Sequence, residues 1–184
     1  MKTEFQKMRS EELYDFSDAE INQSAIHAKE ACLRLNRLSL SSPDYREALQ
    51  DLIPGIPDST CVCPPFHCDH GNGIIMGENT FLNYNCVILD GATVTIGNDV
   101  KIGPGCQLVT PQHPIDYVAR RGTCETSYPI EIGDDTWLGA GVIVCPGVKI
   151  GKRCIIAAGS VVIRDIPDDS MAAGNPAVVK KSLR

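Results

Sequence analysis

The feature that most constrains this chain is an aliphatic residue that recurs with a period of six between Met76 and Pro167, interrupted by two extra residues around Val94 and Thr95 and by residues 114–131. Gly often follows it, and the fourth position after it is small or branched. Neither an amphipathic helix nor a two-sided strand has a period of six. A hexapeptide period is typical of a parallel β-helix, whose neighbouring coils bury one continuous core. The positions are Met76, Leu82, Ile88, Ile96, Ile102, Leu108, Ile132, Leu138, Val144, Ile150, Ile156 and Val162.

Three hexads make one eighteen-residue coil of a triangular prism, so the clean repeat predicts four coils. Because coils stack at the spacing of paired strands, this part should be a prism roughly 20 Å tall. We expect the aliphatic side chains to stack inside it. We also expect the following glycines, such as Gly103 and Gly139, to supply the positive φ that a corner requires. The period does not determine the handedness.

The chain divides into a helical cap over residues 1–57, a parallel β-helix over 58–170 and a C-terminal tail over 171–184. Asp18 is a good N-cap for a helix through Leu35, and Ser42 with Pro43 predicts the start of a second helix ending near Ile53. Residues 58–75 predict an irregular first coil. The repeat breaks over 114–131, which predicts a protruding loop, and a long loop on a rigid scaffold often carries function.

Composition excludes several classes of protein. With 184 residues and 43% hydrophobic content, the chain can form one well-filled domain with appendages. A net charge of −6 argues against nucleic acid as a partner. There is no apolar stretch long enough for a membrane span or a secretory signal. We therefore expect a cytoplasmic protein.

The nine cysteines do not form an obvious disulfide framework. Cys86, Cys106 and Cys154 occupy the small inward position of the hexad, where a thiol acts as a small hydrophobe. We expect free thiols in a reducing compartment. One cluster leaves a structural metal open, although its spacing differs from the usual zinc pair: Cys61, Cys63 and Cys68, with His67 and His70.

His113 is the best candidate for chemistry that the repeat itself offers. It closes the second clean coil at the root of the protruding loop. Histidine titrates near neutrality and suits the removal of a proton from a hydroxyl group. A surface histidine without a role is the alternative interpretation, and its place beside the loop disfavours that alternative.

Residues 8–180 contain an ordered set of further motifs, of which His113-Pro114-Ile115-Asp116 at the loop root is the most specific. The others are Met8 with Glu12-Leu13-Tyr14, Pro64 to Gly71, Leu82 to Asp90, Glu125 before Pro129-Ile130, Trp137-Leu138-Gly139, and Ala173 to Ala177. Together they resemble the maltose/galactoside O-acetyltransferase family of hexapeptide-repeat acyltransferases.

This resemblance implies a left-handed β-helix, a homotrimer and active sites shared between subunits. It implies acetyl transfer from acetyl-CoA to a sugar hydroxyl, with no metal required. His113 matches the catalytic histidine, which would deprotonate the acceptor as it attacks the thioester. Glu125 matches an acidic loop residue that could orient the imidazole, although a solvated carboxylate is an equal alternative.

The resemblance also implies two groups of binding residues. On the acceptor side it points to Asn83 and Asp69, and to Asp90, which could equally be a corner residue. The Tyr14-Asp15 segment matches the N-terminal part of this pocket, and the choice between Asp15 and Asp18 stays open. On the donor side it points to Trp137, Ala140, Ala158, Arg164, Lys180 and Lys181, with the Ala140 amide facing the thioester oxygen.

Other functions remain alternatives on the same fold. A hexapeptide acetyltransferase could act on an antibiotic, a serine or an amine. A metal enzyme of the γ-carbonic anhydrase type needs three histidine ligands, and only His113 lies in the clean repeat. A binding module that has lost catalysis would not need His113, Asn83, Glu125 and Trp137 together. Ile163 and Val178 depart from the family pattern, which leaves the CoA nucleotide contacts less defined than the donor.

Overall fold

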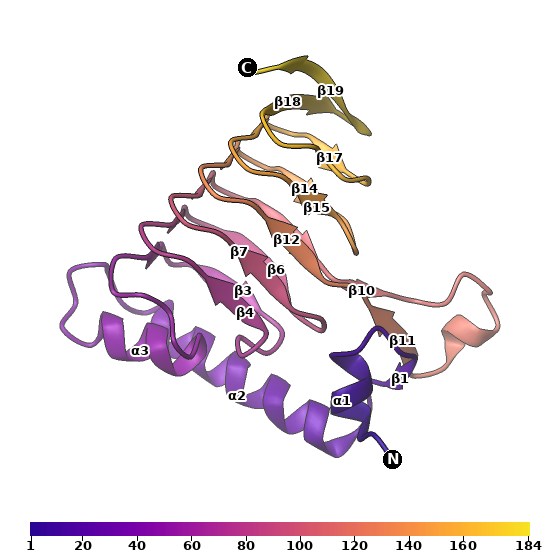
Figure 1. Ribbon diagram of the computed structural model, residues 1–184. Coiled ribbons are helices and arrows are strands. Elements are labelled where there is room, and N and C mark those ends of the chain that lie inside the picture. Colours follow the sequence, from indigo (N-terminus) through magenta and orange to yellow (C-terminus); the bar gives the residue numbers. More distant parts are fainter.

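The computed structural model describes residues 1–184 as a triangular solenoid with a helical cap at one end (Figure 1). The helices are α1 (Glu4–Met8), α2 (Ala19–Leu35) and α3 (Tyr45–Leu52). Figure 1 shows α2 and α3 beneath the first coils, with the C-terminus at the opposite end. None of the helices is long and apolar enough to cross a membrane.

Three parallel sheets form the faces of the prism. The first face contains β2 (Cys61–Val62), β5 (Phe81–Leu82), β8 (Lys101–Ile102), β13 (Trp137–Leu138), β16 (Ile155–Ile156) and β18 (Ser170–Gly174). The second contains β3 (Phe66–Cys68), β6 (Cys86–Leu89), β9 (Gln107–Val109), β14 (Ile143–Val144) and β17 (Val161–Val162). The third contains β4 (Ile74–Met76), β7 (Val94–Ile96), β12 (Ile130–Ile132) and β15 (Lys149–Ile150).

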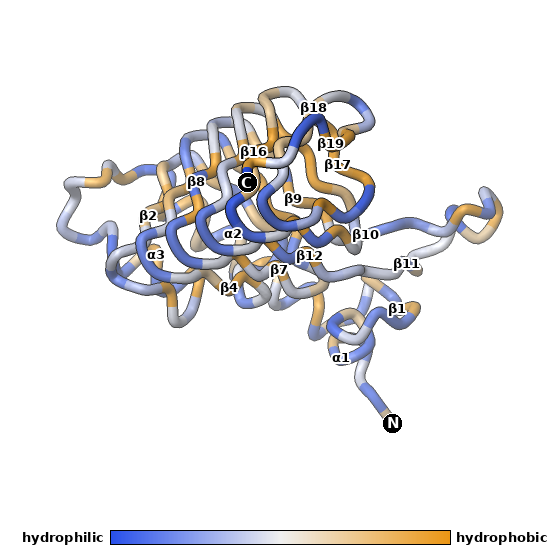
Figure 2. Tube along the Cα trace, turned by 45° about the horizontal axis from the view of Figure 1, so that its top comes forward, coloured by the Kyte–Doolittle hydropathy of each residue, from blue (hydrophilic) through white to orange (hydrophobic).

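The strand register follows the hexad. On the first face, Leu82 pairs with Ile102, Ile102 with Leu138, and Leu138 with Ile156. These side chains are at most 2% exposed and belong to one core of 36 residues. Figure 2 shows how hydrophobic and hydrophilic residues alternate around the coils. The predicted fold class, a left-handed parallel β-helix with a helical cap and a protruding loop, is confirmed.

The solenoid extends beyond the clean repeat at both ends. Strands β2, β3 and β4 form the predicted irregular first coil. At the other end, β18 pairs in parallel with β16, so residues 171–174 continue the first face rather than leaving it as a tail. The chain then reverses into β19 (Ala177–Ser182), which pairs antiparallel with β18. The predicted four coils therefore undercount the stack.

The glycines of the repeat are required for a different reason from the one predicted. Positive φ falls three residues after most of the aliphatic positions, as at Asn85 (62°) and Gly141 (66°). The glycine directly after the aliphatic residue instead lies against the next coil. A Cβ on Gly139 would lie 2.6 Å from the backbone nitrogen of Ala158. Close stacking of coils, and not corner geometry, requires glycine there.

The helical cap follows its predicted signals only in part. The Asp18 side chain accepts hydrogen bonds from the backbone of Glu20 and Ile21, which confirms it as the N-cap of α2. The predicted start of the second helix at Pro43 is wrong, because α3 begins at Tyr45. Ser42 is engaged in a preceding turn, where its hydroxyl accepts a hydrogen bond from the backbone nitrogen of Ser39 at 3.0 Å.

The predicted loop is an extended arm with its own strands. It contains β10 (Pro111–Gln112), a 3₁₀ turn over Ala119–Arg121, and β11 (Cys124–Ser127). The N-terminal strand β1 (Tyr14–Asp15) pairs antiparallel with β11, which also pairs with β10 (Figure 1). The return to the solenoid comes at Ile130, two residues earlier than the hexad predicts.

Gly133 offers a direct test of the stacking argument. A Cβ there would lie 2.6 Å from the backbone nitrogen of Lys152, so Gly133→Ala should lower the free energy of unfolding by about 1–3 kcal/mol. Gly122, whose Cβ would meet only a carbonyl oxygen at 3.3 Å, is the control, and Gly122→Ala should change it by less than about 0.5 kcal/mol. Chemical denaturation measures both. Equal effects would contradict the close-stacking explanation.

Candidate active site

His113 and Glu125 meet at the base of the arm. His113 follows β10, and Glu125 lies in the neighbouring strand β11, so the antiparallel pairing brings them together. Oε2 of Glu125 lies 3.4 Å from Nδ1 of His113. The Glu125 side chain is 13% exposed, whereas that of His113 is 57% exposed. The carboxylate is therefore held inside while the imidazole faces outward, with Nδ1 turned to the acid and Nε2 free.

The N-terminal segment completes the surroundings of this pair. The Tyr14 hydroxyl donates a hydrogen bond to Oε1 of Glu125 at 2.5 Å and lies 2.9 Å from the Ser127 hydroxyl. The Phe16 ring meets the His113 ring edge to face, with centroids 6.2 Å apart. Burial and the bond to Glu125 raise the pKa of the Tyr14 phenol, so it stays protonated. Sequence analysis singled out the Tyr14-Asp15 segment but missed these contacts.

A cavity of about 250 Å³ opens beside His113. Asp69 lies on its wall together with His113 and Glu125, so the structure brings three of the predicted site residues together. Its other lining residues come mainly from the N-terminal segment and α2: Met8, Tyr14, Phe16, Ile21, Asn22, Ala25, Lys29, His70 and Gly91. Lys29 and Asn22 carry polar groups that the sequence reasoning did not identify. Their signal was hidden, because both lie on the polar side of an ordinary amphipathic helix.

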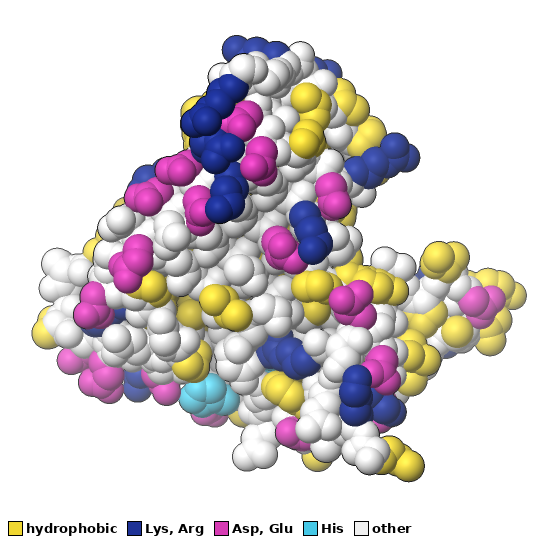
Figure 3. All heavy atoms as spheres, viewed as in Figure 1, with side chains coloured by type: hydrophobic (Ala, Val, Ile, Leu, Met, Phe, Trp, Pro, Cys, Tyr) yellow, Lys and Arg dark blue, Asp and Glu magenta, His cyan; other side chains and the backbone are white.

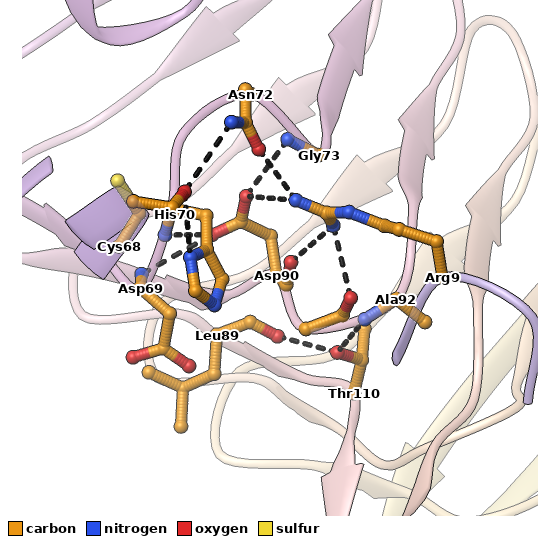
Figure 4. A network of polar contacts seen from close by, with 12 residues as sticks. Arg9, Cys68, Asp69, His70, Asn72, Gly73, Leu89, Asp90, Ala92 and Thr110 are labelled. Carbon is orange, nitrogen blue, oxygen red and sulfur yellow. Dashed lines mark hydrogen bonds and ion pairs between the residues drawn. The ribbon is translucent and has the colours of Figure 1, made fainter. Parts of the chain in front are cut away.

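Asp90 lies beneath this cavity and is fully buried (Figure 4). Its carboxylate accepts hydrogen bonds from the backbone nitrogens of Asp69 (3.1 Å), His70 (2.8 Å) and Gly73 (3.0 Å). The Arg9 guanidinium approaches the same carboxylate at 4.0 Å. The structure thus favours the corner interpretation of Asp90. It fixes the loop that presents Asp69 and has no exposed surface to offer an acceptor.

Two titratable groups in this loop have shifted pKa values. Burial, followed by repulsion from Asp90 and Glu125, raises the pKa of Asp69 to about 6. Burial lowers the pKa of His70 to about 4. The Asp69 carboxyl makes no hydrogen bond within the chain and faces the cavity, so a bound molecule can contact it.

The predicted donor residues Ala140 and Ala158 lie at a different corner of the prism, and the predicted acceptor residue Asn83 lies there with them. All three follow first-face strands, on coils stacked one above another. The backbone N–H groups of Ala140 and Ala158 donate no hydrogen bond within the chain. Trp137 lies in β13, just before this corner, and is 53% exposed. Asn83 and the two free amides therefore lie along one edge, which we name the first corner (residues 83–85, 103–105, 139–141 and 157–159).

The remaining predicted site residues lie neither at the cavity beside His113 nor at the first corner. Arg164 follows the second-face strand β17, at the corner from which the arm departs on an earlier coil. Lys180 and Lys181 are exposed on β19. The Asp15 carboxylate accepts hydrogen bonds from the backbone and hydroxyl of Ser17 and does not line the cavity beside His113.

The side chains of the cluster Cys61, Cys63, Cys68, His67 and His70 point in different directions and do not converge. Cys68 points into the core and Cys63 is buried outside that cluster, whereas His67, between them in the chain, is exposed. All nine cysteines are free, and no three His, Cys, Asp or Glu side chains are arranged to hold a metal ion. Cys68 instead contacts Cys32 of α2, with the two sulfurs 3.8 Å apart.

A larger hollow of about 590 Å³ lies on the third face, over charged side chains (Figure 3). Lys149 pairs with Glu131 and Lys152 with Asp134, both at 2.8 Å. The lysines are therefore already paired with carboxylates, and no histidine or cysteine lines the hollow. The histidine–carboxylate pair lies instead at the cavity beside His113.

Comparison with known proteins agrees with this geometry. Residues 7–53 match the maltose acetyltransferase hexapeptide capping motif, and residues 129–164 match the bacterial transferase hexapeptide repeats. A putative acetyltransferase of Saccharomyces cerevisiae is 43% identical over 159 residues, which cover 84% of this chain and 81% of that protein. The fold and these relatives are those of a hexapeptide-repeat acyltransferase.

Similar solved structures show to which family of acyltransferases the chain belongs. A maltose O-acetyltransferase from Clostridium difficile is 35% identical, with a TM-score of 0.96 over 100% of this chain and 98% of that one. A hexapeptide-repeat acetyltransferase from Vibrio cholerae, solved with acetyl coenzyme A, is 39% identical, with a TM-score of 0.93 and full coverage of both chains. The chain belongs to the maltose/galactoside O-acetyltransferase family.

The shifted pKa values predict two opposing dependences of stability on pH. The folded state holds the Asp69 proton more tightly than the unfolded state, so this group's contribution falls as pH rises from about 4 to 6. The folded state holds the His70 proton less tightly, so its contribution rises between about pH 4 and 6.5. Each change amounts to about 2–3 kcal/mol and largely masks the other.

Single variants at Asp69 and His70 should reveal each pH dependence separately. The free energy of unfolding of Asp69→Asn should rise more steeply with pH than that of the unmodified protein, whereas that of His70→Gln should fall. Denaturation midpoints between pH 4 and 7 measure both slopes. Parallel profiles for all three proteins would show that neither group titrates in this window.

Proposed function

We propose that this protein transfers the acetyl group of acetyl-CoA to a hydroxyl group of a sugar, with His113 as general base. The observation that carries the proposal is the His113–Glu125 pair at a cavity that also presents the unpaired Asp69 carboxyl. A carboxyl facing a small cavity suits a polyhydroxyl acceptor, because it can accept a hydrogen bond from a neighbouring hydroxyl. Relatives named as maltose and galactoside acetyltransferases agree with this acceptor class.

The geometry supports direct attack. Glu125 would hold the tautomer of His113 in which Nδ1 carries the proton, which leaves Nε2 free to take a proton from the acceptor hydroxyl. The hydroxyl oxygen then attacks the thioester carbonyl carbon, and negative charge develops on the carbonyl oxygen. As the C–S bond breaks, the imidazolium returns its proton to the sulfur of CoA. No covalent enzyme intermediate is needed, so the cysteines have no part in the reaction.

The later coils of the first corner, at Ala140 and Ala158, suit the donor half of the site. The free N–H of Ala140 can donate to the thioester oxygen as it becomes negative, and such backbone donors stabilise an oxyanion without reorganisation. The free N–H of Ala158, one coil further along, can bond the pantetheine arm. Related structures solved with acetyl coenzyme A or coenzyme A support this donor. Arg164, Lys180 and Lys181 would serve its phosphates.

The separation of the two halves supports a homotrimer. His113 leaves the second face, whereas Asn83, Trp137 and Ala140 follow the first face, so one chain holds these groups at different corners. A neighbouring copy that places its first corner against the arm would complete the site. The tip of the arm is apolar and exposed, with Ile115 at 87% and Tyr117 at 62%, which fits a surface that a second copy covers.

Removing the base should abolish most turnover. We expect His113→Ala to lower kcat by about 10²–10⁴-fold with little change in the acetyl-CoA Michaelis constant, because a positioned base acts only in the transition state. Release of free CoA, measured over a panel of sugar acceptors, is the assay. His27→Ala is the matched control, since His27 is an exposed histidine on α2, near Asp51. More than half of normal turnover in His113→Ala would remove His113 from the mechanism.

The acceptor and donor halves should respond separately. Asp69→Ala and Asn83→Ala should lower kcat/KM for the acceptor by about five- to a hundredfold, because losing one buried polar anchor costs about 1–3 kcal/mol. The acetyl-CoA Michaelis constant should be nearly unchanged. Asp44→Ala is the control, because Asp44 precedes α3 without a side-chain capping bond. Equal losses in kcat/KM for the acceptor and for acetyl-CoA would contradict the assignment of Asp69 and Asn83 to the acceptor.

A further inference from the structure

We propose that Tyr14 is a positioning residue of this site, whose phenol fixes the Glu125 carboxylate and, through it, the His113 imidazole. The inference rests on the proposed role of His113 as general base. It assigns the N-terminal segment a part in catalysis that is distinct from capping the solenoid.

Backbone pairing makes the contact specific. Tyr14 and Glu125 are direct partners in the antiparallel pair formed by β1 and β11. Side chains of directly opposed residues emerge on the same side of the sheet, about 5 Å apart at Cβ. The phenol thus reaches Oε1 of Glu125 at 2.5 Å, while Oε2 faces His113 at 3.4 Å. Each carboxylate oxygen has one partner, which sets the plane of the carboxylate.

Burial of Tyr14 keeps its hydroxyl group in contact with Glu125. Tyr14 is 2% exposed, and its ring packs with Met8 and Ile21 in a small core of its own. The phenol cannot turn away to water, so it is committed to Glu125 and Ser127. The arm otherwise attaches to the solenoid only at its root, where β10 pairs with β11. Without β1, Glu125 would lie on the free edge of a two-stranded ribbon, which is marginally stable alone.

Phe16 holds the same base from another side. It lies two residues beyond Tyr14 and meets the His113 ring edge to face. One short segment therefore contacts both members of the pair, Glu125 through a hydrogen bond and His113 through an aromatic contact. The Tyr14 hydroxyl is the only one of these groups that can be deleted without changing the shape of the packing.

Tyr14→Phe tests the role of the hydroxyl. We expect kcat to fall about five- to fiftyfold, because the base loses its fixed orientation, while the Michaelis constants for acceptor and acetyl-CoA change less than about twofold. Tyr45→Phe is the matched control. Tyr45 is also a buried tyrosine, and its hydroxyl donates to the carbonyl of Val62 at 2.8 Å, far from the arm. That variant should lose stability similarly and keep its kcat.

A double-mutant cycle separates positioning from a merely structural role. If Tyr14 acts through Glu125, adding Tyr14→Phe to Glu125→Gln should lower kcat less than about twofold further. Full additivity of the two losses would overturn the proposal, as would a Tyr14→Phe variant with unchanged kcat. Turnover retained by His113→Ala would instead contradict the proposed function, so the two failures are distinguishable.

Discussion

The stacking of one aliphatic side chain on another, coil after coil, is the interaction on which the rest of this structure depends. Leu82, Ile102, Leu138 and Ile156 lie in register and are almost fully buried. Because the coils stack closely, the residues at each corner also stack. This register is what aligns the free amides of Ala140 and Ala158 along one edge, so the core determines where a long, thin donor can lie.

The acceptor side depends on a different constraint. The arm leaves the solenoid just before His113, and the solenoid alone gives it no rigidity. Pairing of β1 with β11 supplies that rigidity, and Asp90, with its backbone hydrogen bonds, holds the loop that carries Asp69. A buried carboxylate that accepts several backbone N–H groups is a strong local anchor. The positions of His113 and Glu125 are therefore determined by segments far apart in the sequence.

The sequence predicts the solenoid well because its period reports the burial of each residue directly. The hexad identified the strands from Leu82 to Val162, the arm, and the inward cysteines, of which Cys86 is 1% exposed. It misassigned the glycines, because contact between coils leaves no trace in the period itself. It also missed Tyr14 on Glu125 and Lys29 in the cavity. The Tyr14–Glu125 contact joins residues 111 positions apart, and Lys29 meets the cavity through packing of α2 on the first coil, so no local pattern encodes either contact. The roles given to Asn83 and Trp137 came from the family resemblance and stay predictions.

The central claim is that each active site combines the arm of one chain with the first corner of another. Mixing two inactive variants, His113→Ala and Ala140→Trp, after joint unfolding and refolding tests it most directly. Ala140 is exposed, so tryptophan there should block the donor edge and spare the fold. Random assembly in a closed ring leaves about a quarter of the sites intact, and we predict that share of normal activity. A mixture no more active than its separate components would contradict the shared site.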